Sequence, residues 1–187
     1  MRTTFWCWTL TACLTLARPA SAQDEWDRAD SAATRLRPSA FSQLPAGIRR
    51  GLEERGCTVP QSLERRQPHN VIRGEFQQPG QLDWAVLCSR ARVSTILVFW
   101  NGNPAEVDSV ATTPDRSYLQ GMGAEGIVFS RGISGADSAF LYRQRQHHGG
   151  PEPPRPLHHG INDSFDGKAS VVWYWHRGQW LTLAGVD

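Results

Sequence analysis

The segment formed by residues 70–100 constrains the fold more than any other part of the sequence. It reads NVIRGEFQQPGQLDWAVLCSRARVSTILVFW, with runs of aliphatic, β-branched and aromatic residues separated by a Pro-Gly turn and a short basic turn. Such runs, bounded by turn residues, predict an antiparallel meander with strands at residues 71–76, 84–89 and 94–100. The second and third runs are apolar on both faces, so we expect this sheet to be covered on each side.

Residues 1–22 have the pattern of a secretory signal peptide. A basic start precedes an apolar run over residues 5–17 and the small-residue sequence Ala20-Ser21-Ala22. This pattern predicts cleavage after Ala22, and the run is too short to remain as a membrane anchor. A second interpretation stays open, because Leu10-Thr11-Ala12-Cys13 resembles a bacterial lipobox, which implies a lipid on Cys13. The apolar run continues beyond Cys13, which favours a periplasmic or extracellular protein without a lipid.

Removal of this leader changes the charge and the cysteine content of the chain. The full sequence of 187 residues has 20 basic and 18 acidic side chains, and loss of Arg2 and Arg18 leaves the two signs balanced. A balanced chain gives no support to nucleic-acid binding. Of the four cysteines only Cys57 and Cys88 remain, and a single pair in an exported chain predicts a disulfide. The closed loop of about thirty residues contributes on the order of 3 kcal/mol in the chain-entropy model.

Residues 41–56 predict the helix that this disulfide would attach to the sheet. Apolar side chains recur every four residues along this segment, at Leu44, Ile48 and Leu52. This spacing places them on one face of a helix. Pro45 suits the first turn, and Gly56 suits a left-handed end directly before Cys57.

The N-terminal segment of the exported chain has two interpretations. Residues 23–37 predict either a helix or a mobile arm, because their apolar positions are helically spaced but the segment is polar. The expected organisation is a leader at residues 1–22, an arm or helix at 23–40 and a single α+β domain at 41–187. In that domain we expect a mainly antiparallel sheet of about six to eight strands, with the helix that starts at Phe41 packed on one side.

The C-terminal half predicts two hairpins. The first is expected between residues 127–131 and 139–145, and an exposed, poorly ordered loop rich in proline should follow at 146–157. The second joins residues 169–175 to residues 179–184 through the turn His176-Arg177-Gly178. Its alternating aromatic residues are typical of a half-buried strand.

One part of the meander carries a pattern associated with calcium. Gly74-Glu75-Phe76, Gly80, Asp83 and Ala85-Val86 form the sequence G-E-F-x-x-x-G-x-x-D-x-A-V. This segment resembles the FG-GAP loop of integrin-like propellers and of many secreted bacterial proteins, in which acidic residues bind calcium between two strands. The resemblance implies Glu75, Gln77 and Asp83 as calcium ligands, although calcium takes six or more oxygens and Gln77 is an amide. The alternative is a tight hairpin in which Glu75 and Asp83 accept backbone hydrogen bonds.

A second resemblance lies near the C-terminus. Residues 158–170 read HHGINDSFDGKAS and precede an aromatic strand and the final Asp187. They resemble the pattern H-x-G-I-x-D-x-F-x-x-K-A-S at the end of secreted bacterial proteins of unknown function. That resemblance implies the α+β fold and leaves the activity open.

The same segment holds the candidate catalytic residues. His159, Asp163, Asp166 and Lys168 are titratable groups close together in sequence, and such a set can carry acid–base chemistry or bind a metal. A hydrolase would use His159, Asp163 and Lys168. The alternative is a polar turn in which Asp163 caps a helical turn and Lys168 pairs with an acid. Zinc, redox and phosphate-loop motifs are missing from the sequence.

The tryptophans suggest a binding role. Six of them lie outside the leader, at Trp26, Trp84, Trp100, Trp173, Trp175 and Trp180. Aromatic rings on a sheet can stack on sugars or anchor a partner, and Trp180 is the candidate for exposure because polar residues flank it. The leading hypothesis is an exported, non-catalytic module that binds an envelope protein or a cell-wall component. The alternatives are the hydrolase and a calcium-stabilised module, and no other cofactor is expected.

Overall fold

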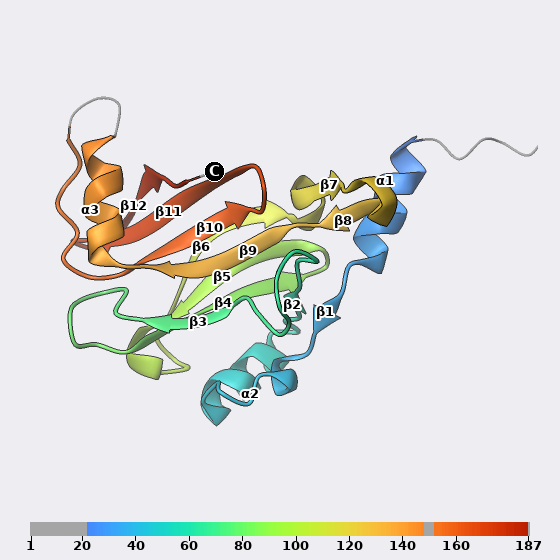
Figure 1. The fold of residues 1–187 in the computed structure, drawn as a ribbon. Coiled ribbons are helices and arrows are strands. Elements are labelled where there is room, and N and C mark those ends of the chain that lie inside the picture. The colour runs from blue at the N-terminus through green and yellow to red at the C-terminus, as the bar shows by residue number, and fades with distance from the viewer. Residues whose placement is uncertain (1–21, 148–151, 187) are drawn as a thin grey trace, which may run out of the picture.

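A computed structural model describes residues 22–147 and 152–186, and within them the chain adopts an α+β fold (Figure 1). This part holds 3 helices and 12 antiparallel strands in four sheets. The predicted fold class is therefore confirmed. The predicted leader and most of its cleavage site lie outside the described residues.

Two four-stranded sheets form the centre of the molecule. Sheet 1 has the order β3-β4-β5-β6, with β3 (Val71–Gly74), β4 (Asp83–Arg90), β5 (Val93–Phe99) and β6 (Val107–Pro114). Sheet 2 has the order β12-β11-β10-β9, with β9 (Arg131–Ala136), β10 (Gly160–Phe165), β11 (Ala169–His176) and β12 (Gln179–Ala184). The meander and the C-terminal hairpin form as predicted, but their strands belong to two separate sheets.

The smaller elements lie around these sheets. Two short sheets pair β1 (Arg35–Leu36) with β2 (Val59–Pro60) and β7 (Leu119–Gly121) with β8 (Ile127–Phe129). The helices are α1 (Ala22–Ala32), α2 (Ala46–Glu54) and α3 (Ser138–Gln146). Single 3-10 turns occur at Pro38–Ala40, Trp100–Gly102, Asp115–Tyr118 and Gly123–Glu125.

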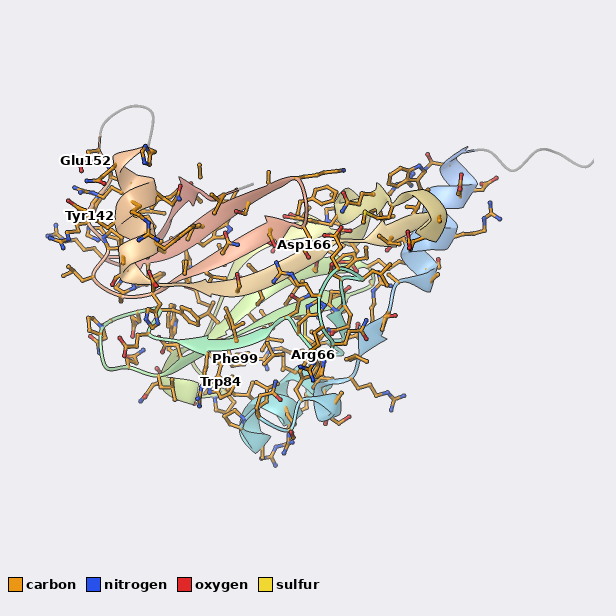
Figure 2. All side chains as sticks on the ribbon, in the orientation of Figure 1. Arg66, Trp84, Phe99, Tyr142, Glu152 and Asp166 are labelled. Carbon is orange, nitrogen blue, oxygen red and sulfur yellow. A yellow bond between two sulfur atoms is a disulfide. The ribbon has the colours of Figure 1, made fainter. Side chains whose placement is uncertain are left out.

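The two sheets lie face to face, with α2 on the outer side of sheet 1 and α3 at one end of sheet 2 (Figure 1). Helix α2 packs Ile48 and Leu52 on one face of sheet 1, where Figure 2 labels Trp84 and Phe99. The second cluster lies between the sheets and joins side chains from β4 and β5 to side chains from β9 and β10. Helix α3 packs Leu141 against sheet 2, in a third cluster with Val172 and Tyr174 of β11. This arrangement explains why β4 and β5 are apolar on both faces.

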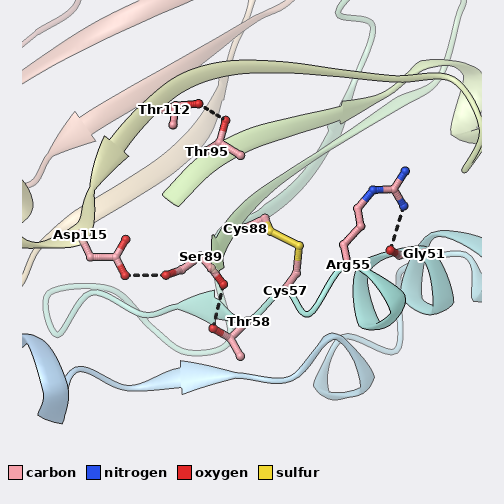
Figure 3. Close-up of a disulfide and its surroundings, with 9 residues drawn as sticks. All are labelled: Gly51, Arg55, Cys57, Thr58, Cys88, Ser89, Thr95, Thr112 and Asp115. Carbon is pink, nitrogen blue, oxygen red and sulfur yellow. Dashed lines mark hydrogen bonds between the residues drawn. A yellow bond between two sulfur atoms is a disulfide. The ribbon is translucent and has the colours of Figure 1, made fainter. Parts of the chain in front are cut away.

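The predicted disulfide joins the end of α2 to sheet 1 (Figure 3). Cys57 and Cys88 are bonded, with their Cα atoms 5.2 Å apart. Gly56 has φ of 69° directly after the helix, which turns the chain toward β4 as predicted for a left-handed end. Backbone hydrogen bonds between Thr58 and Ser89 in both directions extend the attachment.

Two parts of the C-terminal half differ from the predictions. Residues 139–145 belong to helix α3, and the expected hairpin there is wrong; Asp137 caps this helix by accepting a hydrogen bond from the Phe140 amide at 2.6 Å. Residues 160–165 form β10, an inner strand of sheet 2, and not the polar turn that was one interpretation of this segment.

The N-terminal segment is a helix and not a free arm. Helix α1 contacts β7, β8 and the turn before β7, and Trp26, Ala29 and Ala33 pack against the inter-sheet cluster. It ends at Ala32, earlier than the pattern suggested, and Arg35 beyond it is bonded to Asp30 and Asp115. Within residues 22–147 and 152–186, no helix has both the length and the hydrophobicity needed to cross a bilayer.

Candidate functional site

The structure separates the three candidate catalytic residues. His159 joins the start of β10 to the loop after β3: its Nδ1 accepts a hydrogen bond from the Glu75 amide at 3.1 Å, and its own amide donates to the Glu75 carbonyl at 2.9 Å. Asp163 lies four positions further along the strand, which corresponds to about 13 Å. Lys168 is exposed beyond the end of the strand, with its Nζ 4.1 Å from the centre of the Phe165 ring. Each side chain thus has a different partner.

Asp163 forms a buried ion pair with Arg131 of the neighbouring strand of sheet 2, and Arg131 also reaches sheet 1. Arg131 Nε donates to Asp163 Oδ1 at 2.9 Å, and Arg131 Nη2 donates to Asp163 Oδ2 at 2.8 Å. The other guanidinium N–H groups reach the Ser94 carbonyl, the Ser94 hydroxyl and the Ala111 carbonyl. All five donors therefore have acceptors. The Ala111 carbonyl faces inward at a break in the pairing of β5 with β6, where Ala111 has φ of 58°.

Asp166 forms a second ion pair at the end of β10 (Figure 2). Arg65 Nε and Nη2 donate to its two carboxylate oxygens at 2.8 and 2.5 Å, and the Ser164 hydroxyl donates at 2.7 Å. Burial alone would raise the pKa of Asp166, but the hydrogen bonds from Arg65, Ser164 and Ser62 and the charge of Arg65 lower it below its usual value. The group is held ionised by these partners.

The carboxylate of Asp83 is fully buried and holds the loop between β3 and β4 together. It accepts hydrogen bonds from the amides of Phe76, Gln77 and Asn101 and from the Gln81 side chain, at 2.7 to 3.0 Å. The Gln77 side-chain oxygen also accepts from Gln81, at 2.7 Å. Asp83 therefore accepts backbone hydrogen bonds within a tight hairpin, which was the alternative to calcium binding. Within the described residues, no three His, Cys, Asp or Glu side chains are grouped so that they could hold a metal ion.

Trp180 lies half-buried in a cluster of three indoles. Its ring stacks on Trp100 with centroids 5.7 Å apart and meets Trp175 edge-on at 5.4 Å. Trp175 and Trp180 are a cross-strand pair of β11 and β12, whereas Trp100 follows β5 in the other sheet. The Trp180 Nε1 donates to Asp108 of β6 at 3.1 Å. The cluster therefore also holds the two sheets together.

A groove beside the disulfide is the candidate binding site. It has a volume of about 380 Å³, and we call it the disulfide groove. Its lining residues are Arg55, Cys57, Cys88, Arg90, Val93, Thr95, Leu97 and Thr112. Figure 3 shows the disulfide with Arg55, Thr95 and Thr112 around it. Small-molecule and cofactor sites have volumes of this order, from about 300 Å³ upward.

The groove exists because α2 is too short to cover sheet 1. A helix of 9 residues is about 14 Å long, whereas a strand of 8 residues such as β4 is about 26 Å long. The start of β5 therefore lies bare: Val93 is 40% exposed, while Leu97 further along is 8% exposed and forms the floor. The hydroxyls of Thr112 and Thr95 are bonded to each other at 2.8 Å, and Thr95 also donates to the Val110 carbonyl.

The groove carries positive charge without an acid among its lining residues. Arg55 and Arg90 are exposed, and neither takes part in an ion pair with any residue that the structure describes. Arg55 donates one hydrogen bond, to the Gly51 carbonyl at 2.8 Å. A neighbouring hollow shares Arg90, but its Arg35 is bonded to Asp30 and Asp115. Of these two neighbouring hollows, the groove is therefore the one in which no lining arginine is engaged in an ion pair with a described residue.

The chain matches no protein-family model, no curated protein and no solved structure. No sequence motif marks the groove. The balanced total charge conceals its two arginines. The apolar run at residues 94–100 predicts a strand, but it leaves out Val93 and does not indicate which part of the strand's face stays bare.

Proposed function

We propose that this protein is an exported binding module of the cell envelope and that the disulfide groove is its binding site. One observation carries the proposal: the bare part of sheet 1 forms a hollow of about 380 Å³ with an aliphatic floor, two threonines and two unpaired arginines. A mostly apolar concave site with a few polar groups is the usual form of a binding pocket. The ligand is an envelope protein or a cell-wall component.

The residues of the groove favour binding over catalysis. Its cysteines are bonded to each other, its threonines are hydrogen-bonded, and its remaining side chains are aliphatic or guanidinium groups. A general base near neutral pH requires an imidazole, a carboxylate or a perturbed amine, and none of these lines the groove.

Export is supported by two independent features. The sequence begins with the pattern of a signal peptide, and the structure joins Cys57 to Cys88. Disulfides persist in oxidising compartments such as the periplasm and the extracellular space. The groove would therefore face envelope components and not cytosolic ones.

The test compares two valine variants of the oxidised protein without its leader. Val93 in the groove is 40% exposed, and Val171 on sheet 2 is 41% exposed, so Val93→Glu and Val171→Glu place the same charge at equally exposed strand positions. Both are measured by calorimetry against solubilised cell-wall fragments and peptides from envelope proteins. The proposal predicts that a ligand from this panel binds the parent chain and the Val171→Glu variant and loses binding to the Val93→Glu variant. The proposal is contradicted if a ligand binds all three chains equally, or if nothing in the panel binds the parent chain.

A further inference from the structure

The groove also indicates the chemistry of its ligand. Resting on the proposed binding function, we infer that the disulfide groove binds an acidic peptide segment in an extended conformation. In this arrangement a carboxylate lies between Arg55 and Arg90, and a neighbouring aliphatic side chain lies over Val93 and Leu97.

The two arginines come from different elements and converge on one groove. Arg55 follows the last turn of α2, and Arg90 is the last residue of β4, directly before the turn into β5. Both are exposed and line the same hollow without an acidic neighbour in its lining. Guanidinium groups bind carboxylates through charge-assisted and often bidentate hydrogen bonds. An anionic group therefore complements this rim better than a neutral or cationic one.

The floor of the groove favours a peptide over a glycan. Val93, Leu97 and the disulfide are aliphatic or sulfur surfaces, and no aromatic ring lines the groove. Sugar rings are commonly held by stacking on aromatic side chains, but the three clustered indoles of this protein stack on one another, and Trp180 also donates a hydrogen bond to Asp108. An aliphatic side chain of a peptide fits the floor, and the threonine hydroxyls, whose hydrogens are already donated, can accept hydrogen bonds from its backbone amides.

The test measures binding of defined probes by fluorescence anisotropy. The main probe is a dye-labelled hexapeptide of alternating valine and glutamate. Its neutral partner has glutamine in place of glutamate, and a labelled oligomer of galacturonic acid represents an acidic glycan. The oxidised chain without its leader is used throughout, and the unfolding temperature of each variant reports on folding.

The variants remove single positive charges. Arg55→Gln and Arg90→Gln act at the groove, and Arg50→Gln is the matched control, because Arg50 is an exposed residue of α2 that does not line the groove. We expect the glutamate peptide to bind in preference to both other probes. Each groove variant should weaken its binding by about fivefold to tenfold, as for one charge-assisted hydrogen bond at a partly exposed site. The control should leave binding unchanged.

The outcomes separate this inference from the proposed function. The acidic-peptide inference is overturned if the glutamine peptide binds as strongly as the glutamate peptide, or if the galacturonic acid oligomer binds more strongly. If Val93→Glu abolishes that binding, the groove remains a binding site. An equal effect of Arg50→Gln also overturns the inference, because it shows attraction by total charge. If none of the probes and none of the envelope fragments binds in a manner that Val93→Glu changes, the proposed function fails as well.

Discussion

The contribution of the disulfide to stability can be calculated from the length of the loop that it closes. The double variant Cys57→Ala/Cys88→Ala removes a crosslink between residues 31 positions apart. In the chain-entropy model, closing a loop of this length restricts the unfolded chain by about 3.7 kcal/mol. For a chain of this size each kcal/mol corresponds to about 2–4 °C in the unfolding temperature, so we expect a decrease of about 7–15 °C. This is a large part of a typical total stability of about 5–15 kcal/mol.

Urea unfolding followed by tryptophan fluorescence measures this difference. Three samples are compared: the oxidised parent chain, the double alanine variant and the parent chain after reduction. Cys57 and Cys88 are 4% and 5% exposed, so the alanine variant also loses buried sulfur, whereas the reduced chain loses only the crosslink. The reasoning is refuted if the reduced chain unfolds within about 1 kcal/mol of the oxidised one, because the link would then restrict the unfolded chain far less than the model requires.

Three further predictions concern the buried polar groups. Arg131→Met leaves the Asp163 carboxylate uncompensated and should lower the free energy of unfolding, measured by urea titration, by about 3–5 kcal/mol. The double variant Arg131→Met/Asp163→Leu should recover part of that loss. If the single and double variants lose the same free energy of unfolding, the pairing is contradicted. The pKa of Asp166 is lower in the folded state than in the unfolded state. Its ionised carboxylate therefore contributes to the free energy of unfolding at pH values above the unfolded-state pKa of about 3.9, and this contribution is lost as the pH falls through the folded-state pKa. Asp166→Asn should therefore flatten the dependence of unfolding temperature on pH in this acidic range, and an unchanged slope argues against it. Trp180→Phe removes the hydrogen bond to Asp108 and should cost about 1–2 kcal/mol and alter the near-ultraviolet circular dichroism; an identical spectrum would show that the indole stack does not form.

The parts of the fold with local signals could be predicted from the sequence. The meander over residues 70–100 has apolar runs bounded by turn residues, and the hairpin of β11 and β12 has alternating aromatic residues around a defined turn; both form. The pairing of Cys57 with Cys88 followed from counting cysteines outside the leader. In each case the sequence itself contains the constraint.

The parts that depend on distant partners could not be predicted. Strand β10 reads GINDSF, and its Asn, Asp and Ser residues are typical of turns. Two of its side chains are satisfied by arginines far away in sequence: Asp163 by Arg131, 32 residues away, and Ser164 by Arg65, 99 residues away. The groove has a similar origin, because it arises from the short length of α2 over a longer sheet and not from any motif.

The most direct test of the account is a nitrogen-15 chemical-shift titration of the oxidised chain with the valine–glutamate hexapeptide. We predict that the peptide shifts the backbone amides of Val93, Thr95 and Thr112 and the side-chain Nε of Arg55, while the indole Nε1 signal of Trp180 stays in place. Shifts confined to the indole signals, with the groove amides unchanged, would contradict the claim that the bare part of sheet 1 is where this protein binds its ligand.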